Sequence, residues 1–215
     1  MIECKDDSGV LTVTLNRPDK ANSLTREMLE NLVEITAGAA TARALILTGA
    51  GKVFSAGADL DEARAGLATS DVWERLSANI AGLPALTIAA LNGTLAGGAM
   101  GMALACDLRL AVPNAKFFYP VMKLGFLPQP SDPARMRALI GPARTKLILM
   151  GGQKIDAPTA FQFGLVDQVV PRDDLLDAVQ AIAADTVAAP AAIYLAHTGK
   201  AASALVLTAH GLDPV

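Results

Sequence analysis

Residues 86–106 contain no charged side chain, and this feature restricts most strongly what the chain can fold into. The stretch is long enough for a helix to cross a lipid bilayer. An Asn-Gly pair at 92–93 and glycines at 97, 98 and 101 interrupt it, however, and Asp107 follows directly. We therefore expect a buried strand, a tight turn and a buried helix, and no membrane span.

The composition indicates one folded domain. The chain has 215 residues, of which 52% are hydrophobic and 18% charged, and this balance excludes a disordered chain. Because only 4% of the residues are aromatic, Ala, Val, Leu and Ile must fill the core. The formal net charge of -3 leaves no general basic surface for nucleic acid. An anionic ligand would therefore need local Lys or Arg side chains and backbone N–H groups.

The two cysteines, Cys4 and Cys106, lie far apart and have no metal-ligand spacing. This pattern predicts two reduced thiols in a cytoplasmic protein and no metal site. The first seven residues carry acidic side chains where a signal peptide would be basic and then apolar. We therefore expect no targeting segment.

Strand and helix patterns alternate along the chain. Residues 10–15 alternate and are β-branched, which is typical of a strand. A helix with apolar residues at helical spacing follows Thr25, a favourable N-cap residue. Further strands are expected at 44–48, 86–91, 107–112 and just before 170, and further helices at 70–81, 97–105, 133–140, 143–150, 158–163 and 173–188. This order predicts an α/β fold in which helices cover a sheet.

Two loop-to-helix junctions, at 55–59 and 93–99, consist of very small residues. Without large side chains, a ligand can approach the main chain closely. The unpaired N–H groups at a helix start favour negative charge. Two such junctions could direct two N–H groups at one oxygen and form an oxyanion hole. The alternative is that the glycines only allow close packing.

Five segments resemble, in order, the signatures of the crotonase (enoyl-CoA hydratase/isomerase) superfamily. They are residues 16–24, 47–60, 91–107, 118–128 and 157–170. The second and third segments contain the two junctions. No single segment is specific to the superfamily. The five segments together are specific, because they occur in this order and at this spacing over about residues 10–190.

The resemblance implies a fold, an assembly and a ligand. The fold would be an α/β, crotonase-like ββα spiral over residues 1–190 with a shortened C-terminal helical tail at 191–215. The chain would assemble as a homotrimer or hexamer. The N–H groups of Ala58 and Gly98 would point at the carbonyl of an acyl-CoA thioester. Coenzyme A would be part of the substrate, and no separate cofactor is expected.

The resemblance also implies which residues contact the substrate. Coenzyme A would lie along the loops at 20–22 and 56–60, with Lys20 nearest to its phosphates. A solvated lysine is the alternative for Lys20, and helix capping is the favoured alternative for Asp59. The expected substrate-binding residues are Lys20, Ala21, Asn22, Ala56, Asp59, Leu60, Gly97, Pro120, Val121 and Leu124.

The sequence departs from the family pattern at the acid–base positions. In hydratases of the family, two glutamates hold the water that adds to the double bond. The chain has Gly101 and Val121 at these positions, and neither side chain can transfer a proton. Some isomerases of the family carry an acid at another loop position, which is Gln129 in this chain. The proline-rich loop at 128–133 also differs from the glycine-rich form of the family.

Several other groups could replace the missing acids. Asp132 is the best-placed carboxylate, with capping of the next helix as the favoured alternative. Tyr119 could hydrogen-bond to an acyl group, or be a half-buried strand residue. Asp61 or Glu62 could reach the pocket from the helix after the first junction.

Three functions remain open from the sequence. The first is an enzyme that stabilises a thioester enolate, with isomerase, decarboxylase or thioesterase chemistry favoured over hydration. The second is a non-catalytic acyl-CoA-binding or scaffold subunit, because the glutamates are missing and the tail is short. The third, a peptidase of the related fold, is disfavoured because both histidines, at 197 and 210, lie outside the matched segments.

Overall fold

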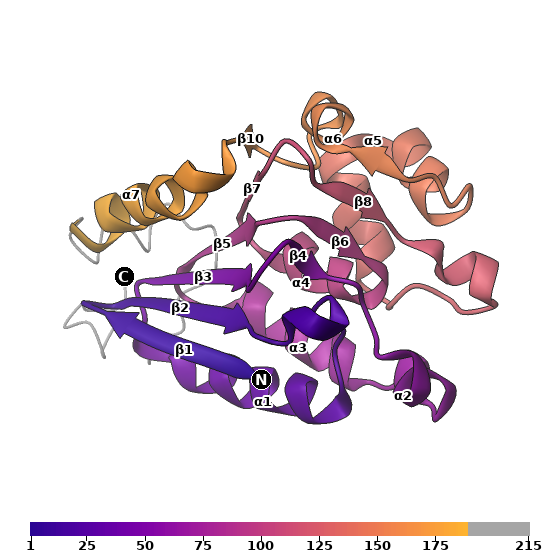
Figure 1. The fold of residues 1–215 in the computed structure, drawn as a ribbon, viewed down its shortest axis with the longest axis horizontal. Helices are drawn as coiled ribbons and strands as arrows, with labels where there is room; N and C mark the ends of the chain where they lie inside the picture. Colours follow the sequence, from indigo (N-terminus) through magenta and orange to yellow (C-terminus); the bar gives the residue numbers. More distant parts are fainter. Residues whose placement is uncertain (189–215) are drawn as a thin grey trace, which may run out of the picture.

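Two sheets form the centre of the computed structural model, which describes residues 1–188 (Figure 1). The larger sheet has the order β1 (Ile2–Asp7), β2 (Val10–Leu15), β3 (Ala44–Gly49), β5 (Leu86–Leu91), β7 (Leu108–Ala111) and β10 (Gln168–Val169). The smaller sheet has the order β4 (Val53–Ser55), β6 (Thr94–Ala96), β8 (Lys116–Phe118) and β9 (Ile155–Asp156). The β1–β2 and β8–β9 pairs are antiparallel, and the other pairs within the described residues are parallel. The predicted tail at 191–215 lies outside the described residues.

Helices follow the strand pairs in a repeating order. The α-helices are α1 (Arg26–Gly38), α2 (Leu60–Arg64), α3 (Val72–Gly82), α4 (Met100–Ala105), α5 (Asp132–Leu149), α6 (Ala157–Phe163) and α7 (Leu175–Ala188). The 3-10 helices are η1 (Pro18–Lys20), η2 (Ala39–Thr41), η3 (Leu67–Thr69), η4 (Gly97–Ala99), η5 (Pro120–Leu124) and η6 (Arg172–Asp174). Three successive strand pairs place their first strand in the larger sheet and their second strand in the smaller one. This pattern confirms the predicted ββα spiral.

The charge-free stretch forms β5, β6, η4 and α4 in succession. Strand β5 is flanked by two parallel neighbours and is buried, which explains its continuous apolar sequence. Every residue of α4 is buried as well. Among residues 1–188 no helix is both long and apolar enough to span a membrane. The expectation of a strand, a turn and a helix is therefore confirmed.

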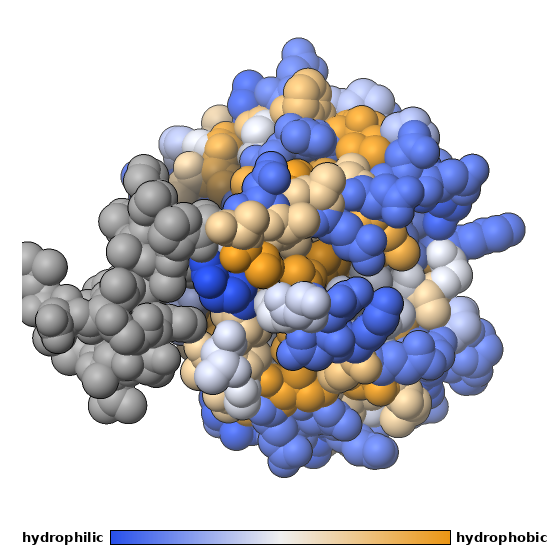
Figure 2. Space-filling model, turned by 90° about the vertical axis from the view of Figure 1, so that its left-hand side faces the viewer, coloured by the Kyte–Doolittle hydropathy of each residue, from blue (hydrophilic) through white to orange (hydrophobic). Residues whose placement is uncertain are grey.

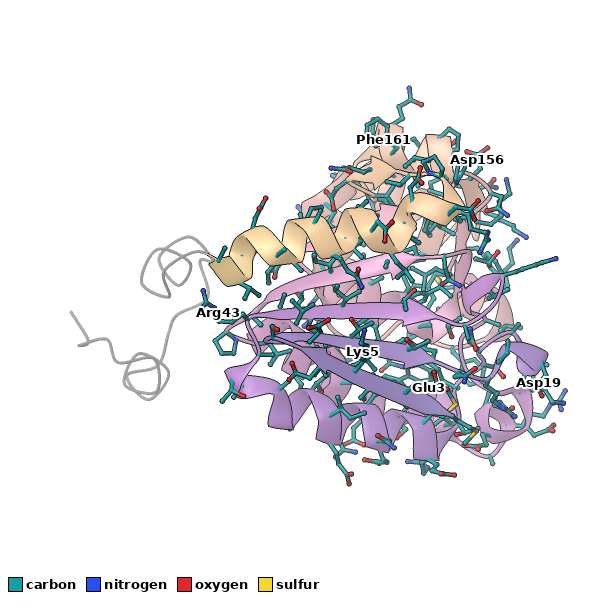
Figure 3. The ribbon with its side chains drawn as sticks, turned by 60° about the vertical axis from the view of Figure 1, so that its left-hand side comes forward. Glu3, Lys5, Asp19, Arg43, Asp156 and Phe161 are labelled. Atoms are coloured by element: carbon teal, nitrogen blue, oxygen red, sulfur yellow. The ribbon has the colours of Figure 1, made fainter. Side chains whose placement is uncertain are left out.

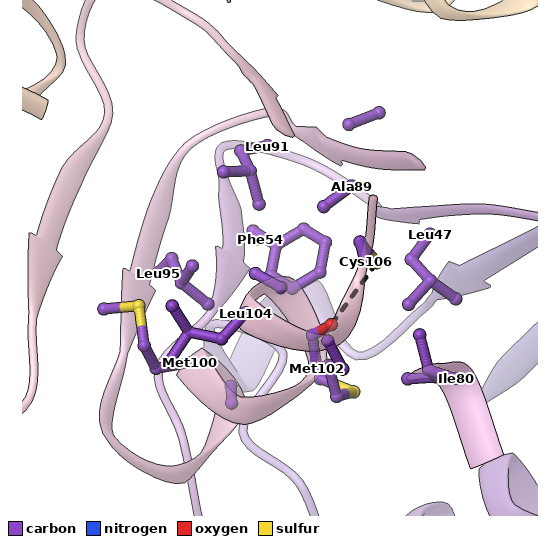
Figure 4. Close-up of a cluster of buried hydrophobic side chains, with 14 of the residues drawn as sticks. Leu47, Phe54, Ile80, Ala89, Leu91, Leu95, Met100, Met102, Leu104 and Cys106 are labelled. Atoms are coloured by element: carbon purple, nitrogen blue, oxygen red, sulfur yellow. Dashed lines mark hydrogen bonds between the residues drawn. The ribbon is translucent and has the colours of Figure 1, made fainter. Parts of the chain in front are cut away.

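The core lies between the sheets and the helices. Figure 4 shows the Phe54 ring among aliphatic side chains from β5, β6 and α4, including Leu91 and Leu104. The Phe54 side chain is fully buried. The thiol of Cys106 is buried too and donates to the carbonyl oxygen of Met102 at 3.3 Å. Small core residues allow α4 to approach the sheet closely, which fixes where its N-terminal end lies.

Strand β1 was not expected from the sequence, because its residues are mostly charged. It forms the edge of the larger sheet and pairs with β2 over its whole length. Figure 3 shows Glu3 and Lys5 on this strand, and both side chains are exposed. Charged side chains on an edge strand discourage pairing with another sheet.

On the face seen in Figure 2, apolar side chains lie in patches among hydrophilic ones.

The two helices expected at 133–140 and 143–150 form one element with a break. Gly141 has φ 77° and ψ 169°, which is not helical, and Pro142 follows it. Proline cannot donate the helical hydrogen bond at this position, so α5 bends there.

Candidate active site

One cavity, of about 120 Å³, brings the two small-residue junctions together. Apolar side chains make up most of its wall, and Tyr119 and Gln129 add polar groups. Eight residues that the sequence placed in the site line it, namely Ala56, Ala58, Leu60, Gly97, Gly98, Pro120, Val121 and Leu124. A second cavity of about 370 Å³ lies between the β1–β2 hairpin and α7. It includes neither junction, so we assign the site to the smaller cavity.

Two glycines allow the junctions to touch. Gly57 and Gly97 have φ values of +93° and +57°, which residues other than glycine rarely adopt. A Cβ atom on Gly57 would lie 2.9 Å from the carbonyl oxygen of Ala96 and 3.3 Å from Cα of Gly97. The loops therefore pack backbone against backbone. Close packing and the oxyanion function are compatible, because this contact places Ala58 and Gly98 in one cavity.

The backbone geometry directs both N–H groups away from their own loops. Leu24 and Ala58 form an isolated parallel bridge, in which Leu24 donates to Gly57 O at 2.8 Å and accepts from Asp59 N at 2.9 Å. Because backbone groups alternate along an extended segment, the N–H of Ala58 faces away from Leu24. Gly98 is the second residue of η4, and the first N–H groups of a helix have no partner within it.

Asn22 holds the first loop in place from inside. Its side chain is fully buried and donates to Ala50 O at 2.9 Å and to Val53 O at 2.7 Å. The hydroxyl of Ser55 donates to the carbonyl oxygen of Asn22 at 2.7 Å. The side chain of Asn22 is thus engaged with the protein backbone, and Asn22 supports the loop rather than lining the cavity.

Asp59 caps helix α2, as the favoured alternative predicts. Its carboxylate accepts from Asp61 N at 3.1 Å and from Arg17 Nη1 at 2.8 Å. The hydrogen bond from Arg17 is the main reason why the pKa of Asp59 lies below its ordinary value. Arg17 also donates to Ser23 Oγ at 3.0 Å. The first junction is therefore tied to the loop at 17–23.

A buried carboxyl group lies behind the cavity wall. The hydroxyl of Tyr119 donates to Asp132 Oδ2 at 2.7 Å and accepts from Gln129 N at 3.3 Å. Tyr119 is 1% exposed and Asp132 is 0% exposed. Burial raises the pKa of Asp132 to about 6, and burial together with the Asp132 charge raises the pKa of Tyr119.

The favoured alternative for Asp132, helix capping, is wrong. Asp132 is the first residue of α5, but its carboxylate bonds to Tyr119 rather than to the helix backbone. Glu74 of α3 serves the helix start instead, because it accepts from Ser131 N at 3.1 Å and from the Ser131 hydroxyl. The expectation that Tyr119 is half-buried is corrected as well, because this side chain is almost completely buried.

Gly101 gives Asp132 its space. A Cβ atom at position 101 would lie 2.9 Å from Asp132 Oδ1. This oxygen has no hydrogen-bond partner among residues 1–188. Gly101 stands where the resemblance implies a hydratase glutamate. A carboxylate from α5 therefore lies against the point on α4 where such a side chain would begin.

The remaining candidates lie away from the cavity. Lys20 is exposed at the end of η1. Asp61 pairs with Arg64 at 3.0 Å in solvent, and Glu62 accepts from Arg26 N at 2.6 Å. Both histidines lie outside the described residues. Within the described part of the chain, no cluster of three His, Cys, Asp or Glu side chains could hold a metal.

Sequence reasoning did not identify Trp73 as a site residue. Its indole N–H donates to Leu67 O at 2.8 Å, which fixes the ring. A Cβ atom on Gly98 would lie 3.2 Å from the ring carbons. Trp73 therefore forms the wall behind one of the two proposed donors. No local signal in the sequence indicates this contact, because it joins α3 to η4.

Comparison with known proteins agrees with this geometry. Residues 5–208 match the family model described as enoyl-CoA hydratase/isomerase. YngF of Bacillus subtilis, named for the same family, is 39% identical over 182 residues, which is 80% of this chain and 70% of YngF. The 1,2-epoxyphenylacetyl-CoA isomerase of Escherichia coli K12 is 33% identical over 189 residues, covering 82% and 72%.

A solved structure supports the same assignment. The enoyl-CoA hydratase of Bacillus anthracis has a TM-score of 0.83 and 33% identity, over 92% of this chain and 80% of that one. The chain therefore belongs to the enoyl-CoA hydratase/isomerase family and has the crotonase fold.

Proposed function

We propose that the chain is a cytoplasmic acyl-CoA enzyme that stabilises a thioester enolate between the N–H groups of Ala58 and Gly98. The observation that carries this proposal is that both residues line one cavity at helix starts. Negative charge that develops on the thioester oxygen would be stabilised by both donors, each worth roughly 2.7–4 kcal/mol in the transition state. The apolar wall suits a hydrocarbon acyl chain.

The same arrangement supports a proposed place for coenzyme A. The loops at 20–22 and 56–60 meet where Ala56 N donates to Ala21 O at 3.0 Å. A coenzyme A moiety along this seam would place its phosphates near the exposed ammonium group of Lys20. We also propose that the chain assembles as a homotrimer or hexamer and uses no separate cofactor.

Hydration is not the proposed reaction. Gly101 and Val121 occupy the positions of the two hydratase glutamates, and neither side chain can activate water. We expect water addition to crotonyl-CoA to be negligible when the loss of enoyl absorbance is followed. Turnover within about tenfold of a typical enzyme rate, roughly 10 per second, would contradict this expectation. Isomerase, decarboxylase or thioesterase chemistry is favoured instead.

A matched pair of substitutions tests the oxyanion hole. Gly98→Ala and Gly98→Pro both add atoms against Trp73, but only proline removes the N–H donor. Each variant is incubated with enoyl-, malonyl- and hydroxyacyl-CoA esters, and products are followed by mass spectrometry. We expect Gly98→Pro to be about 10²–10³-fold slower than Gly98→Ala. Equal rates in the two variants would exclude this N–H as a donor.

The absence of both hydratase glutamates also favours a second candidate, a non-catalytic acyl-CoA-binding subunit. Such a protein would gain thermal stability from acyl-CoA esters and form no product from any of them. Binding without turnover in the experiment above would support this candidate over the enzyme.

A further inference from the structure

We propose that Tyr119 and Asp132 form the acid–base pair of this acyl site and move a proton between Cα and Cγ of a 3-enoyl-CoA. This inference rests on the proposed function. Tyr119 is the group that contacts the acyl chain, and Asp132 is a positioning residue that receives and returns a proton through the phenol. The net reaction converts a 3-enoyl-CoA into a 2-enoyl-CoA.

Tyr119 lies in the wall of the proposed acyl site. It lines the same cavity as Ala58 and Gly98, and it follows strand β8, which fixes its backbone. Its hydroxyl oxygen has two lone pairs. One accepts from Gln129 N at 3.3 Å, and the hydroxyl proton goes to Asp132 Oδ2 at 2.7 Å. The second lone pair is left to accept a proton from the substrate.

Asp132 is a buried carboxyl group hydrogen-bonded to Tyr119. A buried carboxylate normally has partners for both oxygens, because an unpaired buried acceptor costs about 1–3 kcal/mol. Asp132 Oδ1 has none among residues 1–188, and it lies where a side chain at Gly101 would begin. Such a group lowers the stability of the fold, and we take it to mark a functional position. A carboxylate from α5 thus lies beside the position on α4 at which the family resemblance implies a glutamate.

The electrostatic surroundings favour a working base. Glu74 from α3 and Arg135 from α5 itself are the charged groups that act on Asp132. Helix α4 carries only apolar side chains and glycine, so it contributes no titratable group. Burial is the largest cause of the raised pKa of Asp132, about 6, so the carboxylate is ionised at neutral pH but more basic than a surface aspartate.

The proton balance closes without a co-reactant. The Cα–H bond breaks, its electron pair delocalises toward the thioester oxygen, and an O–H bond forms at Tyr119 Oη. The original phenol proton moves to Asp132 Oδ2 in the same step. In the return step this proton goes back to Oη, which delivers its own proton to Cγ, and the double bond moves to the 2-position.

The test separates binding from proton transfer. Binding of butyryl-CoA is measured by thermal shift, and deuterium incorporation at its Cα is followed in D₂O by mass spectrometry. Conversion of 3-hexenoyl-CoA is measured in parallel. We expect Tyr119→Phe and Asp132→Asn to bind butyryl-CoA and to lose exchange and isomerisation by about 10²–10⁴-fold. Asp132→Glu, which keeps the carboxyl group, should retain a measurable part of both activities.

Two controls distinguish this role from a structural one. Asp71→Asn removes an exposed carboxylate at the start of α3 and should leave both activities unchanged. Gly101→Ala keeps both functional groups but presses on Asp132 Oδ1, and it should reduce exchange at least about tenfold.

The wild-type rate should fall as the pH drops below about 6, and any residual activity of Asp132→Asn should lack this dependence.

Each remaining outcome has a defined meaning. Exchange in Asp132→Asn and Tyr119→Phe within about threefold of wild type would overturn the inference and leave the proposed function intact. Binding of butyryl-CoA by the wild type without exchange or isomerisation would also overturn it and would support the non-catalytic candidate. A wild-type protein that binds no acyl-CoA would overturn both proposals.

Discussion

At Asp132, the stability of the fold and the proposed proton transfer oppose each other. Asp132 is fully buried, and burial disfavours its ionised form because the protein interior solvates a charge less well than bulk water does. Its pKa is raised from the ordinary value of 3.8 to about 6 in the folded chain. The folded state therefore binds more protons than the unfolded state between these values, so the stability of the wild type falls as the pH rises from about 4 to 6.

This linkage predicts how Asp132→Asn changes stability. Asparagine does not titrate, so the variant escapes the cost of burying a charge. We expect its free energy of unfolding to exceed that of the wild type increasingly as the pH rises from 4 to 7. The change in this difference should be on the order of 3 kcal/mol, which is the pKa shift converted to energy. Urea unfolding at several pH values measures it, and a difference that is constant with pH would show that folding does not raise the pKa of Asp132.

The sequence predicted part of the cavity lining. Ala58 and Gly98 line the cavity, and they could be named because the small-residue motif and its position before a helix coincide. Asp132 was named as a candidate, but its favoured alternative, capping, is wrong. The reason is physical: the space beside Gly101 comes from a contact between α4 and α5, and spacing along one chain does not reveal it. Trp73 was missed for the same reason.

At the scale of elements, long periodic segments were predictable and short ones were not. Strands β2, β3 and β5 have six residues each and carry apolar or β-branched patterns. Strands β4, β6 and β8 have three residues each, too few to show a period, so the smaller sheet was not expected. These short strands nevertheless position the site, because each leads into a segment that lines the cavity.

Some helix starts are capped by a residue next to them in the sequence and one by a distant residue, and only the local caps can be predicted from the sequence. Thr25 accepts from Met28 N at 3.2 Å, and Asp59 accepts from Asp61 N, both within a few residues. At the start of α5, the backbone N–H of Ser131 donates to the carboxylate of Glu74, which lies on another helix. Relief from capping is what leaves the carboxylate of Asp132 available to Tyr119.

At the scale of the whole molecule, several exposed apolar side chains gather on and after η5 and toward the end of α5. Exposed apolar side chains occur on η5, on the loop after it and at the end of α5, namely Met122, Leu124, Leu127, Leu147 and Met150. Met122 and Met150 also line one groove together with Pro128 and Leu149. Adjoining apolar surface of this kind is typical of an interface between protein chains.

The proposed homotrimer or hexamer makes this surface testable. We expect Met122→Glu with Met150→Glu to lower the mass measured by light scattering toward that of one chain, because two charges would have to be buried in the interface. Leu176→Glu is the matched control, because Leu176 is 46% exposed on α7, which lies on the other side of the molecule (Figure 1). Its mass should equal that of the wild type. An unchanged mass in the double variant would show that chains associate through another face, while a wild type with the mass of one chain would contradict the assembly itself.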